Sequence, residues 1–306
     1  MPLLLVTFSS AWLFVTAAAV AAYLLLYVCL WRFQARCIFF PTNTIERSPA
    51  DLGVRCQQLR IPLNESDGRP QTLDAWWLPA HRENAPAVLY LHGNGDNISI
   101  STYADQAVRL RNLGLSVLLF DYRGFGRSDG AFPSEESVYQ DAESAWRYLV
   151  EQLRMNSEPA FIYGHSLGGA IAIELAQRHP EAAGLIVESS FTSIREMARY
   201  FTIFRIFPLR HRLRHHFDSI SKVPTLKVPV LFLHGTRDLT VPCRMSHELH
   251  AAAPEPKQLL IIRGGHHLDN AVIGGAVYLD TLRGFIDRSG PLAMVAQMPN
   301  CQSPTC

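Results

Sequence analysis

A pentapeptide of the form G-x-S-x-G gives the sequence its clearest chemical signal: Gly164-His165-Ser166-Leu167-Gly168. The apolar run AFIY precedes it and the helix-like stretch LGGAIAIELAQRHP follows it, so it lies at a predicted strand-to-helix turn. Such a turn is sharp and holds the serine oxygen clear of the chain, while the glycines let strand and helix approach closely. The helix N-terminus also brings N–H groups and the positive end of a dipole near the serine. These features predict Ser166 as a nucleophile.

A serine of ordinary pKa needs a base to take its proton, and the base needs a carboxylate to orient it. Asp238 follows the apolar run PVLFLHG, and His266 follows the run QLLIIRG, so each stands just past a predicted strand. The chain order Ser, Asp, His is the one expected for this arrangement. We predict Asp238 as the acid and His266 as the base, since His266 directly follows two glycines. Two alternatives stay open, namely His267 as the base and Glu188 as the acid. Asp238 could also be only a loop carboxylate that closes a turn.

The loop HGNGDNIS (residues 92–99) follows the first central apolar run and supplies the second part of the predicted site. Acyl transfer needs two preorganised N–H donors for the oxyanion, and losing one typically costs about 3–4 kcal/mol of transition-state stabilisation. The backbone N–H groups of Asn94 and Leu167 are the expected pair. A dinucleotide-binding loop is excluded because residue 98, where a third glycine is required, is Ile98.

Short apolar runs alternate with helix-like stretches along residues 37 to about 290, which is one large domain's worth of chain. Continuous Val, Ile and Leu runs are typical of parallel strands that are covered on both faces. The pattern predicts an α/β fold with a doubly wound, mostly parallel sheet. An antiparallel pair, 54–63 and 71–79, opens it around the turn 64–68. The other predicted strands are 87–93, 115–122, 160–166, 184–190, 229–235 and 258–264, and the predicted helices are 101–113, 134–153, 167–178, 243–252 and 273–287.

A stretch of 29 residues near the N-terminus, Leu3–Trp31, contains no charged side chain. A helix needs about 20 apolar residues to span a bilayer core, so residues 3–31 are predicted as a transmembrane anchor. A cleaved signal peptide is the alternative, with Ala19-Val20-Ala21 as its cleavage site, but no Lys or Arg precedes the run and the run is too long. Arg32 and Arg36 follow it directly, which places the catalytic domain of a single-pass protein in the cytoplasm.

Composition excludes several other classes of protein. Lys and Arg number 28 against 27 Asp and Glu, and the net charge of +1 argues against a basic nucleic-acid binder. Hydrophobic residues make up 48% and charged residues 18%, so most of the chain is not disordered. The six cysteines contain no C-x-x-C pair or zinc-type spacing, and we expect neither a metal nor a cofactor.

Several further segments resemble one subgroup of a known superfamily. They are HGNGDNIS, DYRGFGRSDG (121–130), YGHSLGGA (163–170), SSFTSI (189–194), FDSISKV (217–223) and HGTRDLTVP (234–242). Over about residues 55–288 the chain resembles the α/β-hydrolases, and in particular the serine-aminopeptidase-like and bud-emergence-type hydrolases, many of which carry one N-terminal membrane segment. It is also similar to the protein depalmitoylases of that superfamily. The resemblance implies the fold and the triad, but not the substrate. One departure from the related G-H-N-D pattern, Gly265-His266-His267-Leu268-Asp269, leaves room for His267.

A cap over the site is predicted at about residues 191–226, where this fold commonly carries an insertion. Its segment 195–214 holds six arginines interleaved with apolar residues, which fits either a cap packed on the core or one that also rests on anionic lipid. The domains predicted are thus an anchor at 3–31, a hydrolase domain at 37–290 and a loose tail at 291–306. The predicted function is a membrane-anchored serine hydrolase that cleaves an acyl ester or thioester of a small molecule, a lipid or an acylated protein. A serine peptidase and a non-catalytic binding protein are the alternatives.

Overall fold

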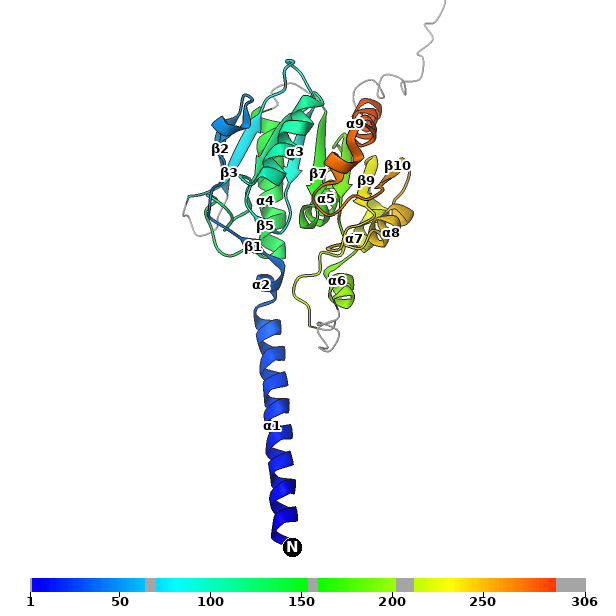
Figure 1. The fold of residues 1–306 in the computed structure, drawn as a ribbon. Helices are drawn as coiled ribbons and strands as arrows, with labels where there is room; N and C mark the ends of the chain where they lie inside the picture. Colours follow the sequence, from blue (N-terminus) through cyan, green and yellow to red (C-terminus); the bar gives the residue numbers. More distant parts are fainter. Residues whose placement is uncertain (1, 64–69, 154–158, 202–211, 290–306) are drawn as a thin grey trace, which may run out of the picture.

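An eight-stranded sheet forms the centre of the computed structural model, which describes residues 2–63, 70–153, 159–201 and 212–289. The strand order is β10-β9-β8-β7-β4-β6-β3-β2, as Figure 1 shows in part. The strands are β2 (Gln57–Leu63), β3 (Gln71–Leu78), β4 (Ala87–Leu91), β6 (Ser116–Phe120), β7 (Ala160–His165), β8 (Gly184–Glu188), β9 (Val230–Gly235) and β10 (Lys257–Ile262).

Strands β4 and β6 to β10 run parallel to their neighbours in this group, whereas β3 is antiparallel to both β2 and β6. All residues of β4, β7, β8 and β9 are buried, because helices cover both faces of the sheet. The predicted doubly wound α/β fold with an antiparallel opening pair is confirmed. The turn predicted at 64–68 lies within residues outside the described ranges.

Helices lie on both faces of the sheet and divide the core in two. Buried side chains of α4 (Glu135–Tyr148), α5 (Leu167–Arg178) and α8 (Arg244–Ala252) share one apolar cluster. Those of α3 (Ser101–Asn112) and α9 (Asn270–Ser289) share the other cluster. The predicted helix at 134–153 is shorter than expected, since α4 ends at Tyr148 and a π-helical turn, Leu149–Leu153, follows it.

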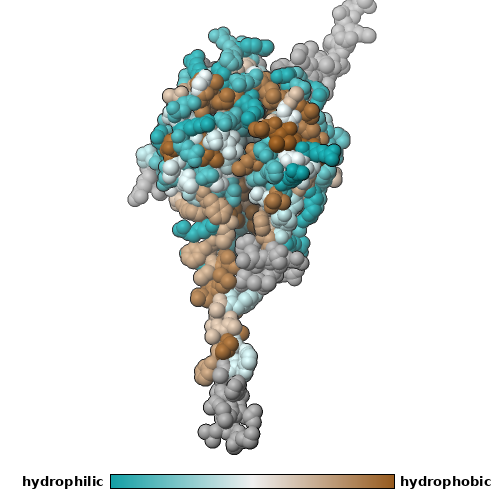
Figure 2. Space-filling model, viewed as in Figure 1, coloured by the Kyte–Doolittle hydropathy of each residue, from teal (hydrophilic) through white to brown (hydrophobic). Residues whose placement is uncertain are grey.

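The N-terminal helix α1 (Pro2–Arg32) projects away from the domain, as Figure 1 shows. Its segment Trp12–Arg32 has a mean hydropathy of 2.4 with none of it buried, so it is a candidate membrane span. Figure 2 shows mainly brown and pale, apolar side chains along the described part of this helix up to the base of the domain. After α1 the chain forms a short helix α2 (Gln34–Ile38), and then β1 (Phe40–Pro41) pairs with β5 (Gly95–Asp96).

The insertion between β8 and β9 forms the predicted cap region. It contains α6 (Ile194–Tyr200), α7 (Ser219–Lys222) and a 3₁₀ turn, Val223–Thr225. Another 3₁₀ turn, Pro49–Leu52, lies early in the chain. Residues 202–211 of the arginine-rich segment and the predicted tail 291–306 lie outside the described residues.

Candidate active site

Ser166 stands at a strained turn between β7 and α5. Its backbone has φ 56° and ψ −118°, a left-handed conformation that L-residues rarely adopt. The flanking glycines are required by close packing: a Cβ on Gly168 would lie 2.1 Å from the carbonyl oxygen of Leu91. A Cβ on Gly164 would lie 2.2 Å from the carbonyl oxygen of Gly168. The strand and helix therefore approach each other as the G-x-S-x-G pattern predicts.

Three side chains from the carboxyl ends of three parallel strands form a hydrogen-bonded chain. The Ser166 hydroxyl oxygen lies 2.9 Å from Nε2 of His267, and Nδ1 of His267 lies 2.7 Å from Oδ2 of Asp238. Ser166 follows β7, Asp238 follows β9 and His267 follows β10. Parallel strands place their carboxyl ends at the same edge of a sheet, and that edge brings the three residues together.

The prediction that His266 supplies the base is wrong, because the structure places His267 against Ser166. Both the backbone N–H and the ring Nδ1 of His266 bind the carboxylate of Asp269, at 2.6 and 3.0 Å. This local turn directs the His266 ring to solvent, where its side chain is 54% exposed, against 15% for His267. The ring of His267, the next residue, is instead mostly buried and contacts Asp238. Asp269 stands three residues after His266 in the sequence, but only the structure shows that it binds this ring while Asp238 binds the ring of His267.

Asp238 is held ionised by its surroundings. Its Oδ1 accepts hydrogen bonds from the N–H groups of Thr240 and Val241, both at 2.8 Å. Nε2 of the buried His234 lies 3.2 Å from its Oδ2. Burial by itself raises the pKa of Asp238, but the hydrogen bonds from His234, His267 and Val241 outweigh it and hold the pKa below its usual value. A carboxylate that stays charged can fix the tautomer of the neighbouring imidazole.

His165, next to Ser166 in the sequence, binds the backbone of His267. Nε2 of His165 lies 2.9 Å from the carbonyl oxygen of His267. Burial, together with the neighbouring His267, lowers the pKa of His165 to about 4. His165 is therefore neutral at pH 7 and donates its Nε2 proton to that carbonyl, which fixes the backbone that carries the His267 ring.

Glu188, the alternative acid, does not belong to this hydrogen-bonded chain. Its Oε2 accepts hydrogen bonds from the hydroxyl groups of Tyr163 and Tyr278, the latter at 2.7 Å. Gln106 donates to the same two tyrosine oxygens. Glu188 thus serves a buried polar network among β7, β8, α3 and α9.

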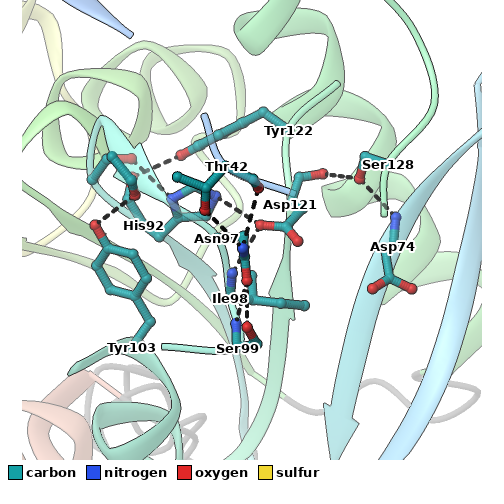
Figure 3. Close-up of polar contacts among 12 residues, drawn as sticks. Thr42, Asp74, His92, Asn97, Ile98, Ser99, Tyr103, Asp121, Tyr122 and Ser128 are labelled. Carbon is teal, nitrogen blue, oxygen red and sulfur yellow. Dashed lines mark hydrogen bonds and ion pairs between the residues drawn. The ribbon is translucent and has the colours of Figure 1, made fainter. Parts of the chain in front are cut away.

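The loop that follows β4 is held by buried polar groups, which Figure 3 draws. Oδ1 of Asp121 accepts the N–H of Ile98 at 2.9 Å and lies 3.5 Å from Nε2 of His92. Burial lowers the pKa of His92 to about 3 and raises the pKa of Asp121 well above its usual value. The Tyr122 hydroxyl binds the His92 carbonyl at 3.1 Å, and Asn97 Nδ2 binds the carbonyl of Thr44 at 2.8 Å. The loop is thereby fixed on both sides.

The segment after α1 also holds this loop, which the sequence pattern did not indicate. The carbonyl oxygen of Asn94 accepts the N–H of Phe40, and its side chain donates to the carbonyl of Ile38, both at 2.8 Å. The pairing of β1 with β5 continues the contact. A two-residue strand has no periodicity to detect, so only the tertiary structure reveals this connection.

A cavity of about 450 Å³ opens beside Ser166. Asn94 and Leu167, the expected oxyanion donors, line it together with Ser166. Most of its other described walls are apolar: Leu30, Cys37, Ile38, Phe40, Phe191, Ile194, Met197, Ala198, Phe201, Leu213 and Val241, with Gln34 and Thr240. Among the described residues, no group of three or more His, Cys, Asp or Glu side chains could hold a metal ion.

Comparisons with known proteins identify the family of this chain. The family described as "Serine aminopeptidase, S33" matches residues 82–219. Protein bem46 of Schizosaccharomyces pombe is 31% identical over 74% of this chain and 76% of its own. Lysophosphatidylserine lipase ABHD12 of Danio rerio is 33% identical over 62% of this chain and 53% of its own.

The fold is similar to that of the Pyrococcus furiosus esterase Pf2001, with a TM-score of 0.67 and 18% identity over 81% of this chain and 98% of the esterase. The chain belongs to the α/β-hydrolase superfamily, in the group related to bem46. It is a hydrolase of the α/β family.

Proposed function

We propose that the protein is a membrane-anchored serine hydrolase that cleaves an acyl ester or thioester through an acyl-enzyme. The observation that carries the proposal is the chain of hydrogen bonds Ser166–His267–Asp238 beside an apolar cavity of about 450 Å³. An apolar cavity with a few convergent polar groups is typical of a site that binds an apolar substrate.

Each residue has a distinct part in the proposed reaction. His267 Nε2 takes the hydroxyl proton of Ser166 as the serine oxygen forms a bond to the acyl carbon. His267 then gives that proton to the leaving alcohol or thiol as the bond between the acyl carbon and the leaving group breaks. Asp238 stabilises the imidazolium that forms between these two steps. A water molecule, deprotonated by His267, finally releases the acid and restores Ser166.

The backbone N–H groups of Asn94 and Leu167 are the proposed donors to the oxyanion. Both residues line the cavity with Ser166, and Leu167 is the first residue of α5, where helix N–H groups are free. The loop that carries Asn94 is fixed by Asp121, Asn97 and the β1–β5 pair, so its donor needs no rearrangement during the reaction.

An ester or thioester is favoured over a peptide. An aminopeptidase must bind the ammonium group of its substrate, and the described residues that line the cavity include no Asp or Glu. A lipase among the relatives and an esterase among the similar folds support the same choice. The complete hydrogen-bonded chain argues against a binding protein that has lost its catalytic residues.

Anchoring by α1 is part of the proposal. The span Trp12–Arg32 is long and apolar enough to cross a bilayer, and Arg32 and Arg36 at its inner end favour a cytoplasmic catalytic domain. The candidate substrates are acylated small molecules, lipids and acylated proteins.

Fluorophosphonate labelling of the detergent-solubilised full-length protein tests the proposal, because the probe reacts only with an activated serine. We expect labelling of the wild-type protein and none of Ser166→Ala. Absence of labelling in folded wild-type protein, or labelling that survives Ser166→Ala, would contradict the proposed site.

A further inference from the structure

Two walls of the cavity come from parts of the chain that are far apart in the sequence. One wall is formed by the end of α1 and by α2, through Leu30, Cys37 and Ile38. The facing wall is formed by α6 of the insertion, through Met197 and Ala198. Ser166 lies in the same cavity, so the reacting oxygen and the end of the membrane helix share one apolar space.

The apolar surface of α1 is continuous with this cavity. Leu30 belongs to the last turn of α1, and it lines the cavity two residues before the helix ends at Arg32. No residue of the span Trp12–Arg32 is fully buried by the rest of the chain, although Leu30 and Trp31 are partly covered. In Figure 1, α2 and α6 lie at the end of the domain from which α1 projects. An apolar chain that contacts the last turn of α1 in the bilayer therefore lies next to a wall of the cavity.

Side chains of α2 hold the two walls together. Nε2 of Gln34 donates to the carbonyl oxygen of Arg212 at 2.9 Å, and its Oε1 accepts the N–H of Arg214 at 2.8 Å. The Arg214 guanidinium lies 4.4 Å from the centre of the Trp31 ring. These contacts join the end of α1 and the helix α2 to residues 212–214 of the insertion, so the two parts of the chain are held together beside the cavity.

Cations surround this end of the molecule. Arg32 ends α1, Arg36 lies on α2 and Arg199 on α6, while Arg214 stacks on Trp31. Glu196 pairs with Arg199. Arginines on neighbouring elements, with one of them stacked on a tryptophan, fit the level of phosphate headgroups. The mouth of the cavity is thereby placed at the membrane surface.

We infer that the substrate is a membrane lipid whose long acyl chain enters the cavity sideways from the leaflet around α1, between α2 and α6. The chain lies against Leu30, Cys37 and Met197, and its carbonyl carbon reaches the Ser166 oxygen. This inference rests on the proposed function and adds to it the substrate class and the route. The ester is cleaved while its alcohol part remains at the headgroup level.

Reconstitution of the full-length protein into phosphatidylcholine vesicles tests the route. A fluorogenic long-chain lipid ester is placed either in the same vesicles as the protein or in separate vesicles, and p-nitrophenyl acetate is supplied from the water as a second substrate. We expect the lipid ester to be hydrolysed at least tenfold faster in the same vesicles. Equal rates in the two arrangements overturn the inference, because the substrate would then come through water.

A bulky side chain in the wall tests the cavity itself. Cys37→Trp is expected to lower the ratio of lipid-ester to acetate hydrolysis at least tenfold, and Ala198→Phe narrows the facing wall and gives the same result. The matched control is Cys29→Trp, an exposed cysteine on α1 that is not among the described cavity residues, and it leaves the ratio within twofold. An unchanged ratio in both wall variants overturns the inference.

The failure of this inference can be told apart from failure of the proposed function. Protein that hydrolyses the acetate and reacts with a fluorophosphonate, but ignores the lipid in its own vesicle, refutes the lipid substrate alone. If that protein releases the acyl chain of a soluble acylated peptide instead, an acylated protein replaces the lipid. Protein that hydrolyses neither ester and takes no label refutes both proposals.

Discussion

The side-chain amide of Asn94 donates a hydrogen bond of 2.8 Å to the backbone carbonyl of Ile38. Asn94 belongs to the loop after β4, beside the proposed nucleophile, and Ile38 ends the short helix α2 that follows α1. The contact links the proposed oxyanion loop to the segment after α1, and Phe40 adds a second bond to the Asn94 carbonyl. The segment after α1 is therefore part of the proposed site.

Replacement of Asn94 tests this link. Asn94→Ala removes one partly buried hydrogen bond, which typically contributes about 1 kcal/mol, and we expect the melting temperature to fall by about 2–4 °C. The rate of ester hydrolysis falls as well, because the loop loses its fixed position. Asn112→Ala, at the exposed end of α3, is the matched control. Thermal unfolding and turnover are measured in the same detergent. An Asn94→Ala variant with the melting temperature and the turnover of the wild type would refute the link.

The two adjacent histidines are expected to respond in opposite ways. His267→Ala removes the partner 2.9 Å from the Ser166 oxygen, and we expect turnover to fall by at least about 10³-fold. His266→Ala removes only a solvent-exposed ring bound to Asp269, and turnover stays within about threefold. Steady-state ester hydrolysis by both variants decides the assignment. A larger loss in His266→Ala would restore it as the base.

Gly168, two residues after Ser166, is expected to be indispensable for folding. Gly168→Ala places a Cβ 2.1 Å from the Leu91 carbonyl oxygen, a separation that forces strand β4 and helix α5 apart. Overpacking of this kind costs about 1–3 kcal/mol or more, so we expect a clear fall in melting temperature or insoluble protein. Gly95→Ala meets nothing within 4 Å and serves as the control. Equal thermal stability of the two variants would contradict the packing argument.

Stability is expected to depend on pH through His165. Its folded-state pKa is about 4, whereas an unfolded histidine titrates near pH 6.5, so below that pH the unfolded state binds the additional proton. The free energy of unfolding therefore falls by about 1.4 kcal/mol per pH unit from this residue as the pH drops from about 6.5 to about 4.

His165→Gln removes this titration and can keep a donor to the His267 carbonyl. As the pH falls from 6.5 to 5, we expect the free energy of unfolding of the wild type to drop by about 2 kcal/mol relative to that of the variant. Urea unfolding of both proteins at the two pH values measures it. A difference that stays constant with pH would show that His165 does not remain neutral in the folded protein.

The basic residues of α6 are expected to make activity depend on lipid charge. Arg195→Gln with Arg199→Gln removes two cations from α6, each worth about 1 kcal/mol near an anionic surface. We expect wild-type hydrolysis to rise when phosphatidylserine is added to the vesicles and to lose that rise at high salt. The double variant shows a smaller rise, whereas Arg283→Gln on α9 behaves as wild type. If activity depends on neither lipid charge nor salt, the basic residues of α6 do not rest on anionic lipid.

Local sequence pattern was sufficient for the sheet and for two members of the site. The unbroken apolar runs of β4, β7, β8 and β9 predict buried parallel strands because such strands have no polar face to show. Ser166 and Asp238 could be predicted because each stands just past a strand, and the carboxyl ends of parallel strands lie at the same edge of the sheet. The apolar length of α1 is likewise a property of composition alone.

Other features depended on contacts between distant parts of the chain. The two histidines stand at nearly the same distance from the end of β10, so their spacing does not separate them. Asp269 binds the ring of His266 and Asp238 binds the ring of His267, and these contacts place His267 at the site. The contact of Ile38 with Asn94 joins residues 56 positions apart, next to a pair of two-residue strands that have no sequence period. The sequence by itself determined which elements form and where a nucleophile stands, because these depend on neighbours in the chain. Only the tertiary structure decided which histidine contacts Ser166 and that the end of α1 lines the cavity, because both depend on packing across the fold.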